Sequence, residues 1–169
     1  MAVDSEGLLY VIHELYADKE VPAMPVYVDS PLATNITKVF GEHPEVYDAE
    51  THETFLKKGK NPFSFNQIEF VGSVEASMAL NRDQTPHIVI SASGMCEAGR
   101  ILHHLLNNVE DPNNIVLMVG YAAQHTLGRR IIEKQPEVKI FGDLMKLNAE
   151  VIVMESFSAH ADADELINY

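Results

Sequence analysis

The sequence predicts an α/β domain of three layers (α/β/α), with a mostly parallel central sheet and one antiparallel edge. Two apolar runs, 87–90 and 115–120, do not alternate with polar residues, which is typical of strands covered on both faces. Each run is followed by small residues and then by an amphipathic stretch, 100–108 or 124–134, so strand and helix alternate as in parallel sheets. A chain of 169 residues suits one domain, and we expect residues 1–169 to form it.

The first part of the chain contributes a helix and a strand. Apolar residues at helical spacing predict a helix over 8–16, and a short β-rich run predicts a strand over 26–28. Ser30 suits the N-cap of a following helix, 32–40, and a proline occupies its first turn. Asp29 then falls at the carboxyl end of a strand. There it either faces a ligand or bonds the amides of its own turn.

The middle of the chain is the least regular part. A surface helix is expected over 46–58, and a strand over 68–71 precedes a helix over 74–80 that Ser73 can cap. The lysines at 57, 58 and 60 form the one dense basic cluster, which we interpret as a solvated loop.

The end of the chain predicts the antiparallel edge. Segments 138–141 and 150–154 have strand composition, and the short link 142–148 allows only a hairpin or a bend between them. We therefore expect these two segments to run antiparallel. A last helix begins within 162–169.

Composition and charge exclude several classes of protein. No apolar run approaches the roughly 20 residues of a membrane span, and the N-terminus lacks the features of a signal peptide. A single cysteine, Cys96, excludes an internal disulfide framework and favours the reducing cytoplasm. The net charge of −13 would repel nucleic acid at long range, so any RNA site must be local.

The loop 91–100 carries the strongest chemical signal in the chain. Small residues between a buried strand and a helix let backbone amides converge on an oxyanion at the helix N-terminus. Arg100, near the start of that helix, can hold a phosphate with two hydrogen bonds. The alternative is an ordinary turn with glycines at crowded points. Segment 120–129 repeats the same strand–loop–helix order, which favours a phosphodiester site along one edge.

Histidine and cysteine offer further candidates. His160 follows a strand and precedes a helix, where an imidazole can exchange a proton or simply cap and pack. The pattern His160-Ala161-Asp162-Ala163-Asp164 also looks like a metal-ligand run, but the two aspartates are better explained as acids at a helix N-terminus. Cys96 fits a buried thiol better than a nucleophile. No metal site is expected within this chain.

Together these stretches resemble the β-CASP domain of metallo-β-lactamase-fold ribonucleases, a group that includes RNA-processing nucleases and the messenger RNA 3′-end cleavage factor. The resemblance covers nearly the whole chain, in order. The residues that carry it are 28–33 (VDSPLA), 91–95 (SASGM) with 99–100 (GR), 120–121 (GY) with 126–128 (TLG), and 157–162 (FSAHAD).

The resemblance implies a role for each matched residue. In this family the β-CASP domain is inserted into a metallo-β-lactamase domain that holds two zinc ions, and RNA lies between the two domains. His160 matches a histidine thought to protonate the leaving oxygen. The positions expected to contact RNA phosphates are Ser91, Ser93, Gly94, Met95, Arg100, Thr126, Gly128, Arg129 and Ser158.

The resemblance also implies that parts of the family are missing here. The zinc-binding motif, the acidic partner of the histidine and a later histidine ligand have no match, so we expect no cofactor in this chain and no activity from it alone. Residues 1–7 depart from the family pattern, either as a leader that replaces native residues or by divergence. With the incomplete final helix, they suggest an excised domain of a larger zinc-dependent nuclease acting on single-stranded RNA.

Two other functions fit the same residues. One is a standalone α/β module that binds a nucleotide or a phosphorylated metabolite with the same loops. The other is a surface for homodimer or complex formation, which suits the acidic charge and leaves the glycine loops unexplained. A salt-dependent affinity for RNA would favour the nuclease domain over both.

Overall fold

A computed structural model describes residues 2–31, 34–35, 39, 42–43 and 65–154 of the chain. The helices with defined bounds are α1 (Ala2–Ala17), α4 (Val74–Leu80), α5 (Ile101–Asn108) and α6 (Leu127–Ile132). The strands are β1 (Val26–Val28), β2 (Ile68–Phe70), β3 (Ile88–Ile90), β4 (Ile115–Val119), β5 (Glu137–Ile140), β6 (Asp143–Lys146) and β7 (Glu150–Met154). None of the helices in this part of the chain is long and apolar enough to span a membrane.

The strands are mostly parallel, as predicted. β1 lies between β2 and β3 and pairs with both in parallel, with Val26 opposite Ile68 and Ile88. β4 pairs in parallel with β7, and β5 forms an antiparallel hairpin with β6. The α/β class with one antiparallel edge is therefore confirmed. Within the described residues the strands form three hydrogen-bonded sheets rather than one.

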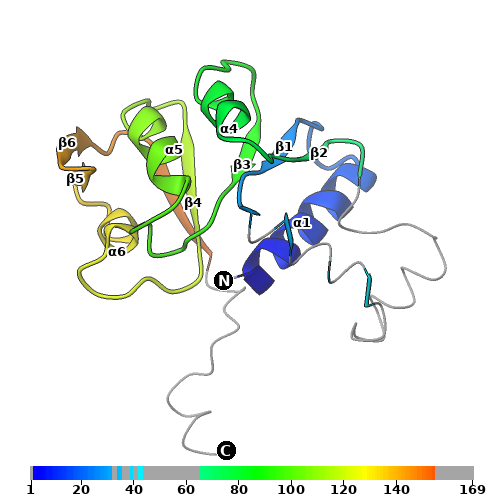
Figure 1. Ribbon diagram of the computed structural model, residues 1–169, viewed down its shortest axis with the longest axis horizontal. Coiled ribbons are helices and arrows are strands. Elements are labelled where there is room, and N and C mark those ends of the chain that lie inside the picture. The colour runs from blue at the N-terminus through cyan, green and yellow to red at the C-terminus, as the bar shows by residue number, and fades with distance from the viewer. Residues whose placement is uncertain (1, 32–33, 36–38, 40–41, 44–64, 155–169) are drawn as a thin grey trace, which may run out of the picture.

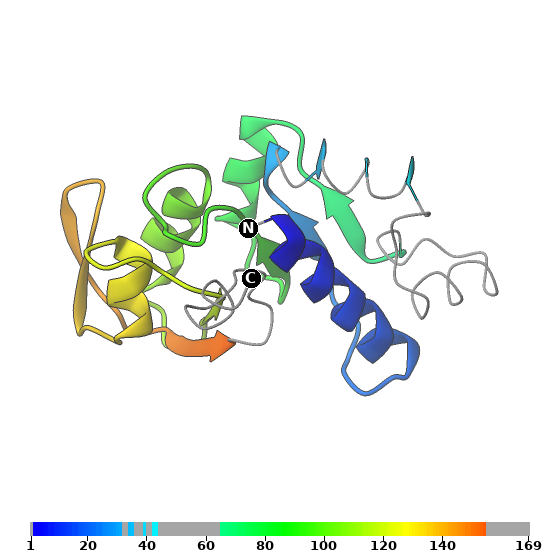
Figure 2. The ribbon, with the colours of Figure 1, turned by 90° about the horizontal axis from the view of Figure 1, so that it is seen from below.

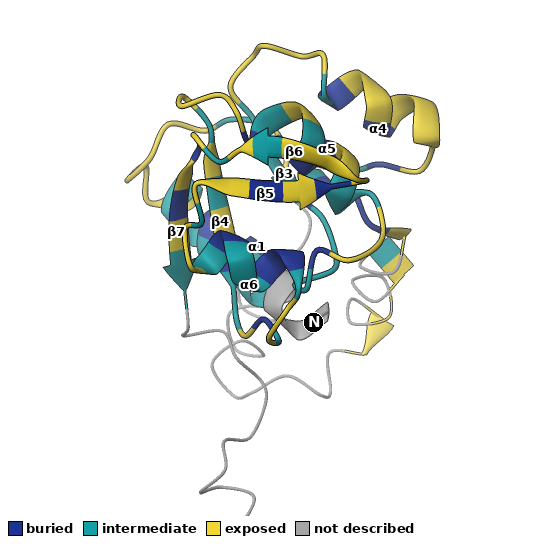
Figure 3. Ribbon diagram, turned by 90° about the vertical axis from the view of Figure 1, so that its left-hand side faces the viewer, coloured by how far each residue is buried: buried dark blue, intermediate teal, exposed yellow. Residues whose placement is uncertain are grey.

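The composition of the antiparallel edge differs from the prediction. The antiparallel partner of β5 is β6, which occupies most of the expected link 142–148, and β7 instead joins β4 in parallel. The physical reason is that Phe141 (φ 51°) and Gly142 (φ 99°) take left-handed backbone conformations, so two residues suffice to reverse the chain. Exposed and buried positions then alternate along β5, as Figure 3 shows.

Helices and strands enclose two apolar clusters. Figures 1 and 2 show α1 lying along the sheet of β1, β2 and β3, where Leu9 and Ile12 pack with strand residues Val26, Val28 and Ile90. The second cluster joins helices α5 and α6 to strands β4, β5 and β7, with Ile131 and Ile140 fully buried.

The helix boundaries follow local capping. Ser73 caps α4, its Oγ accepting a hydrogen bond from the Ala76 amide at 3.0 Å, as expected. α6 begins three residues later than predicted because Thr126 is extended and its Oγ1 accepts the Arg129 amide at 3.2 Å. The predicted helix 32–40 lies mostly outside the described residues, and those over 46–58 and 162–169 lie entirely outside them.

Candidate nucleic-acid interface

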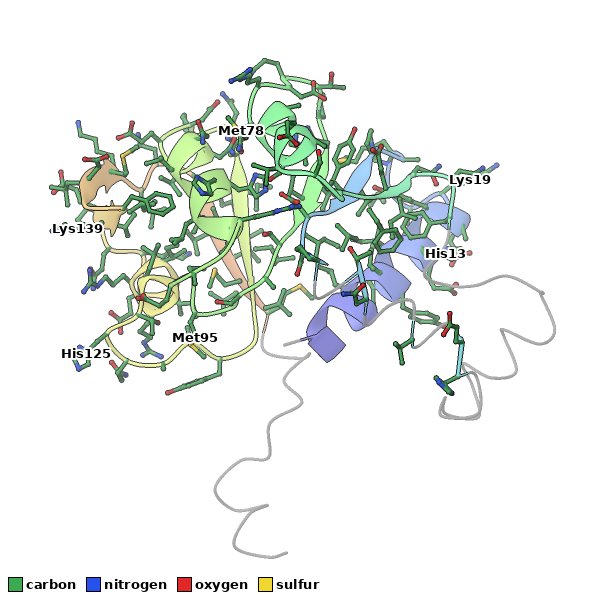
Figure 4. All side chains as sticks on the ribbon, viewed as in Figure 1. His13, Lys19, Met78, Met95, His125 and Lys139 are labelled. Atoms are coloured by element: carbon green, nitrogen blue, oxygen red, sulfur yellow. The ribbon has the colours of Figure 1, made fainter. Side chains whose placement is uncertain are left out.

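Two loops meet at the carboxyl ends of β3 and β4. The Gly128 amide donates to the Met95 carbonyl at 2.9 Å, and the Ala123 amide lies 3.1 Å from the Met95 sulfur. Figure 4 shows Met95 and His125 on the same side of the molecule, opposite Met78. The two strand–loop–helix junctions therefore lie in contact, as expected, but β3 and β4 belong to different sheets among the described residues, so a shared sheet edge is not confirmed. We call loop 91–100 and segment 120–128 together the edge loops.

The edge loops touch through their backbones. A Cβ on Gly128 would lie 2.5 Å from the Gly94 oxygen, closer than real Cβ atoms come, and 3.1 Å from the Met95 carbonyl group, which is unusually tight. Gly128 is thus required for close approach, because the atoms that a Cβ would meet belong to the backbone and cannot turn aside as a flexible side chain can.

Gly128→Ala is expected to lower the free energy of unfolding by about 1–3 kcal/mol, because the backbone of loop 91–100 must shift. Urea denaturation of the 169-residue chain measures this loss. Gly72→Ala is the matched control, since a Cβ there would meet no described atom within 4 Å. Its free energy of unfolding is expected to stay within about 0.5 kcal/mol of the wild-type value. Equal stability of the two variants would contradict the close contact.

The amides at the start of α6 already have partners within the protein. Glu97 Oε1 accepts the Leu127 amide at 2.5 Å, and the carbonyl of Met95 and the hydroxyl of Thr126 accept the next two amides. A carboxylate therefore lies where the sequence suggested a phosphate. Nothing in the sequence marked Glu97 as more than a loop residue, although an acid ahead of a helix is a common N-terminal partner.

The other predicted phosphate contacts lie on or beside the edge loops. Ser91 donates its hydroxyl to the Asp29 carbonyl at 3.0 Å, and Ser93, Gly94 and Met95 are half-buried. Arg129 is half-buried as well, and its Nε donates to Glu133 Oε1 at 2.8 Å on the same helix. These positions keep their RNA-contacting role as a prediction.

Two predicted residues, Ser158 and His160, lie outside the described part of the chain, as do Asp162 and Asp164. Among the described residues, no group of three or more histidine, cysteine, aspartate or glutamate side chains is arranged to hold a metal ion.

Behind loop 91–100 lies a buried polar network centred on Asp29. Its side chain is fully buried, and its carboxylate accepts hydrogen bonds from Arg100 Nη1 and Ser77 Oγ, both at 2.5 Å. His104 Nε2 lies 2.6 Å from the same carboxylate, and Asn81 Oδ1 lies 2.8 Å from His104 Nδ1. Asp29 is thus turned away from solvent, and its described partners join the end of β1 to α4 and α5.

The surroundings of Asp29 favour its ionised form. Burial alone would raise its pKa, but the hydrogen bonds from Ser77, His104 and Arg100 outweigh burial and hold the pKa below the ordinary value. The neighbouring His103 points elsewhere, its ring 4.8 Å from that of Phe141. The two adjacent histidines therefore lie on different faces of α5, as predicted.

Arg100 has a structural partner that the sequence did not reveal. Its Nη1 donates to Asp29 and to the Val71 carbonyl at 3.0 Å, and its side chain is 18% exposed. The residues that would have revealed the pairing stand 71 positions apart in the chain, too far for any local pattern. Phosphate binding by Arg100 remains a prediction, and any phosphate would meet a guanidinium already held by a carboxylate.

Cys96 is a buried thiol, as predicted. Its side chain packs in the second apolar cluster, and burial, with a smaller effect of Glu97, raises the pKa of the thiol to about 12. Such a thiol carries almost no thiolate at neutral pH.

Alkylation of Cys96 by iodoacetamide at pH 8 is expected to be on the order of 10³-fold slower in the folded chain than in the chain unfolded in guanidinium. A pKa of about 12 leaves far less thiolate than the ordinary thiol pKa of about 8.5. Mass spectrometry against time measures both rates. A folded-state rate equal to the unfolded one would show that the thiol is accessible and ionised.

Known proteins are similar in sequence to this chain over most of its length. The profile of the Beta-Casp domain matches residues 6–131. Ribonuclease TTHA0252 of Thermus thermophilus is 39% identical to the chain over 165 residues, which are 98% of this chain and 38% of that protein. Transcription termination factor FttA of Methanosarcina mazei is 31% identical over 98% of this chain and 26% of its own length. FttA of Pyrococcus abyssi is 29% identical over the whole chain and 27% of its own length. The chain thus spans between about a quarter and two fifths of the relatives it matches.

Proposed function

This chain belongs to the β-CASP family, and from that premise we propose that it is the RNA-contacting domain of a longer RNA-processing ribonuclease. The observation that carries the proposal is the match over residues 6–131, together with a relative named as a ribonuclease that is 39% identical. The edge loops support it, because parallel strands of α/β sheets bind ligands at their carboxyl ends.

The proposed reaction is hydrolysis of phosphodiester bonds in single-stranded RNA. His160 is assigned to protonate the leaving oxygen, so that the departing ribose leaves as a neutral hydroxyl. The edge loops and Ser158 are assigned to hold the flanking phosphates in register. Positioning of this kind supplies much of the rate in phosphodiester cleavage, because it fixes the geometry of attack.

The metal is proposed to lie on the rest of the parent protein. On the basis of the resemblance to the β-CASP family, we assign two zinc ions to a metallo-β-lactamase domain of the same parent chain. Zinc there would activate water and stabilise the leaving oxygen. The 169-residue chain alone is accordingly proposed to be inactive.

We further propose that the parent works in the cytoplasm and can form a homodimer. The first statement rests on the single buried thiol, which suits a reducing compartment. The second rests on the exposed apolar side chains, Ile115 and Tyr121 among them, each 60% exposed.

RNA cleavage tests the proposal directly. The 169-residue chain, alone and with added zinc, is compared with a longer protein that restores both flanking parts. Cleavage by the longer protein only is the expected result. Cleavage by the chain alone would place a metal site within it, with 160–164 as the first residues to examine. Absence of cleavage by both, with tight and salt-independent binding of one mononucleotide, would favour the binding module instead.

A further inference from the structure

A groove lies between α4 and α5 and extends along residues 97–100 at the end of loop 91–100. Its volume is about 680 Å³, within the range of small-ligand sites. Figure 4 shows Met78, which lines it, on the opposite side of the molecule from Met95. Its lining includes Met78, Arg82, Arg100, Leu102, His103 and Phe141.

One wall of the groove carries an exposed aromatic ring. Phe141 stands at the tip of the β5–β6 hairpin with 55% of its surface exposed, and its ring lies 4.8 Å from that of His103. Its φ of 51° belongs to the two-residue turn between β5 and β6, which holds the ring at the tip of the hairpin. Met78, 51% exposed, belongs to the lining contributed by α4. The groove thus offers a flat ring and an apolar side chain to solvent.

The groove contains two arginines in a chain whose net charge is −13. Arg82 and Arg100 line it together with one carboxylate, Glu97, and Arg100 is also paired with the buried Asp29, so the surroundings of the groove are close to neutral rather than acidic. Both hydrogen bonds of Arg100 to described residues start from Nη1, so the Asp29 network orients the guanidinium without using its other nitrogens. Arginine held in this way is pre-organised to bind a phosphate.

We propose that this groove binds one nucleotide of single-stranded RNA. The base stacks on Phe141 and His103, and a phosphate pairs with Arg82 and Arg100. Aromatic rings beside cationic groups are how proteins bind unpaired nucleotides. The choice of RNA as ligand rests on the proposed function. An acidic peptide would use the two arginines but would gain little from an exposed aromatic ring.

Binding of a fluorescein-labelled tetraadenylate to the 169-residue chain tests the proposal by fluorescence anisotropy. Phe141→Leu, which keeps an apolar side chain and removes the ring, is expected to raise Kd on the order of 10-fold. Phe141→Tyr should bind as the wild type does. Leu144→Ala is the matched control, because Leu144 lies on the same hairpin, is 65% exposed and does not line the groove.

The phosphate contact has its own readout. Arg82→Ala is expected to weaken binding and to reduce the slope of log Kd against log salt by about one. Circular dichroism and thermal unfolding of each variant show that the fold is kept, which is expected since Arg82 and Phe141 are exposed.

Several results would contradict the proposal that this groove binds a nucleotide. Tetraadenylate binding that is unchanged in Phe141→Leu would do so, and so would a labelled hexaglutamate peptide that binds more tightly than the RNA. The proposed function fails separately, when the longer protein does not cleave RNA. A Phe141-dependent affinity would then still assign the groove to a nucleotide.

Discussion

In the proposed longer ribonuclease, replacing His160 by alanine is expected to lower the turnover number for RNA cleavage by about 10²–10⁴-fold. The reason is that the leaving ribose oxygen would depart without a proton, which raises the barrier of the step. KM should change little, because the proposed role acts on the reacting bond rather than on binding. Steady-state kinetics on a short labelled RNA measure both parameters.

The pH profile distinguishes a proton donor from a packing residue. With His160 present, turnover should fall at high pH as the imidazole loses its proton, and this fall should be absent in His160→Ala. His87→Ala is the control: His87 lies at the start of β3, at the other end of the strand from loop 91–100. If turnover in His160→Ala stays within a factor of two of wild type, the assignment of His160 as proton donor is wrong. The assignment of the fold does not depend on this result.

Asp29→Asn is expected to lower the free energy of unfolding of the 169-residue chain by about 3–5 kcal/mol, the usual cost of breaking a buried ion pair. Arg100 and His104 would then face a neutral amide at the position of a fully buried carboxylate. Urea denaturation measures the loss. Asp143→Asn, at an exposed position of the β5–β6 hairpin, is expected to change stability by less than about 0.5 kcal/mol.

The same substitution should show a defined pH dependence. The pKa of Asp29 is lower in the folded state than in the unfolded state. The ionised carboxylate therefore contributes fully to the free energy of unfolding above the ordinary pKa of 3.8, and this contribution is lost as the pH falls through the folded pKa. The stability difference between wild type and Asp29→Asn should therefore narrow as the pH falls below about 4. A difference that grew on acidification would mean that Asp29 is protonated in the fold.

Sequence reasoning reached most of the fold because its signals are local. The apolar runs of β3 and β4, the cap at Ser73 and the glycine-rich loop each specify backbone conformation within a few residues. The partner of β5 was missed because a left-handed Phe141 is not a usual turn signal, and a longer link was the simpler expectation.

The candidate site was harder to predict because its contacts are distant in the chain. The convergence of the edge loops followed from strand order, but the roles of individual side chains did not. Asp29 and His104 are 75 residues apart, and Glu97 and Leu127 are 30 apart. A hydrophobic periodicity extends over a few turns or strand residues and does not indicate contacts between residues so far apart in the chain. Arg100 therefore looked like a free phosphate ligand when its first partner is a buried carboxylate.

The backbone contact between Gly94 and Gly128 has a consequence for protein engineering and for the drift of this sequence. Since the two segments meet through backbone atoms at Gly128, neither is expected to be exchangeable by itself with the corresponding loop of a relative. Loop grafts are expected to succeed only when both segments come from the same donor. Natural variants should likewise change the two segments together, as a single inherited block.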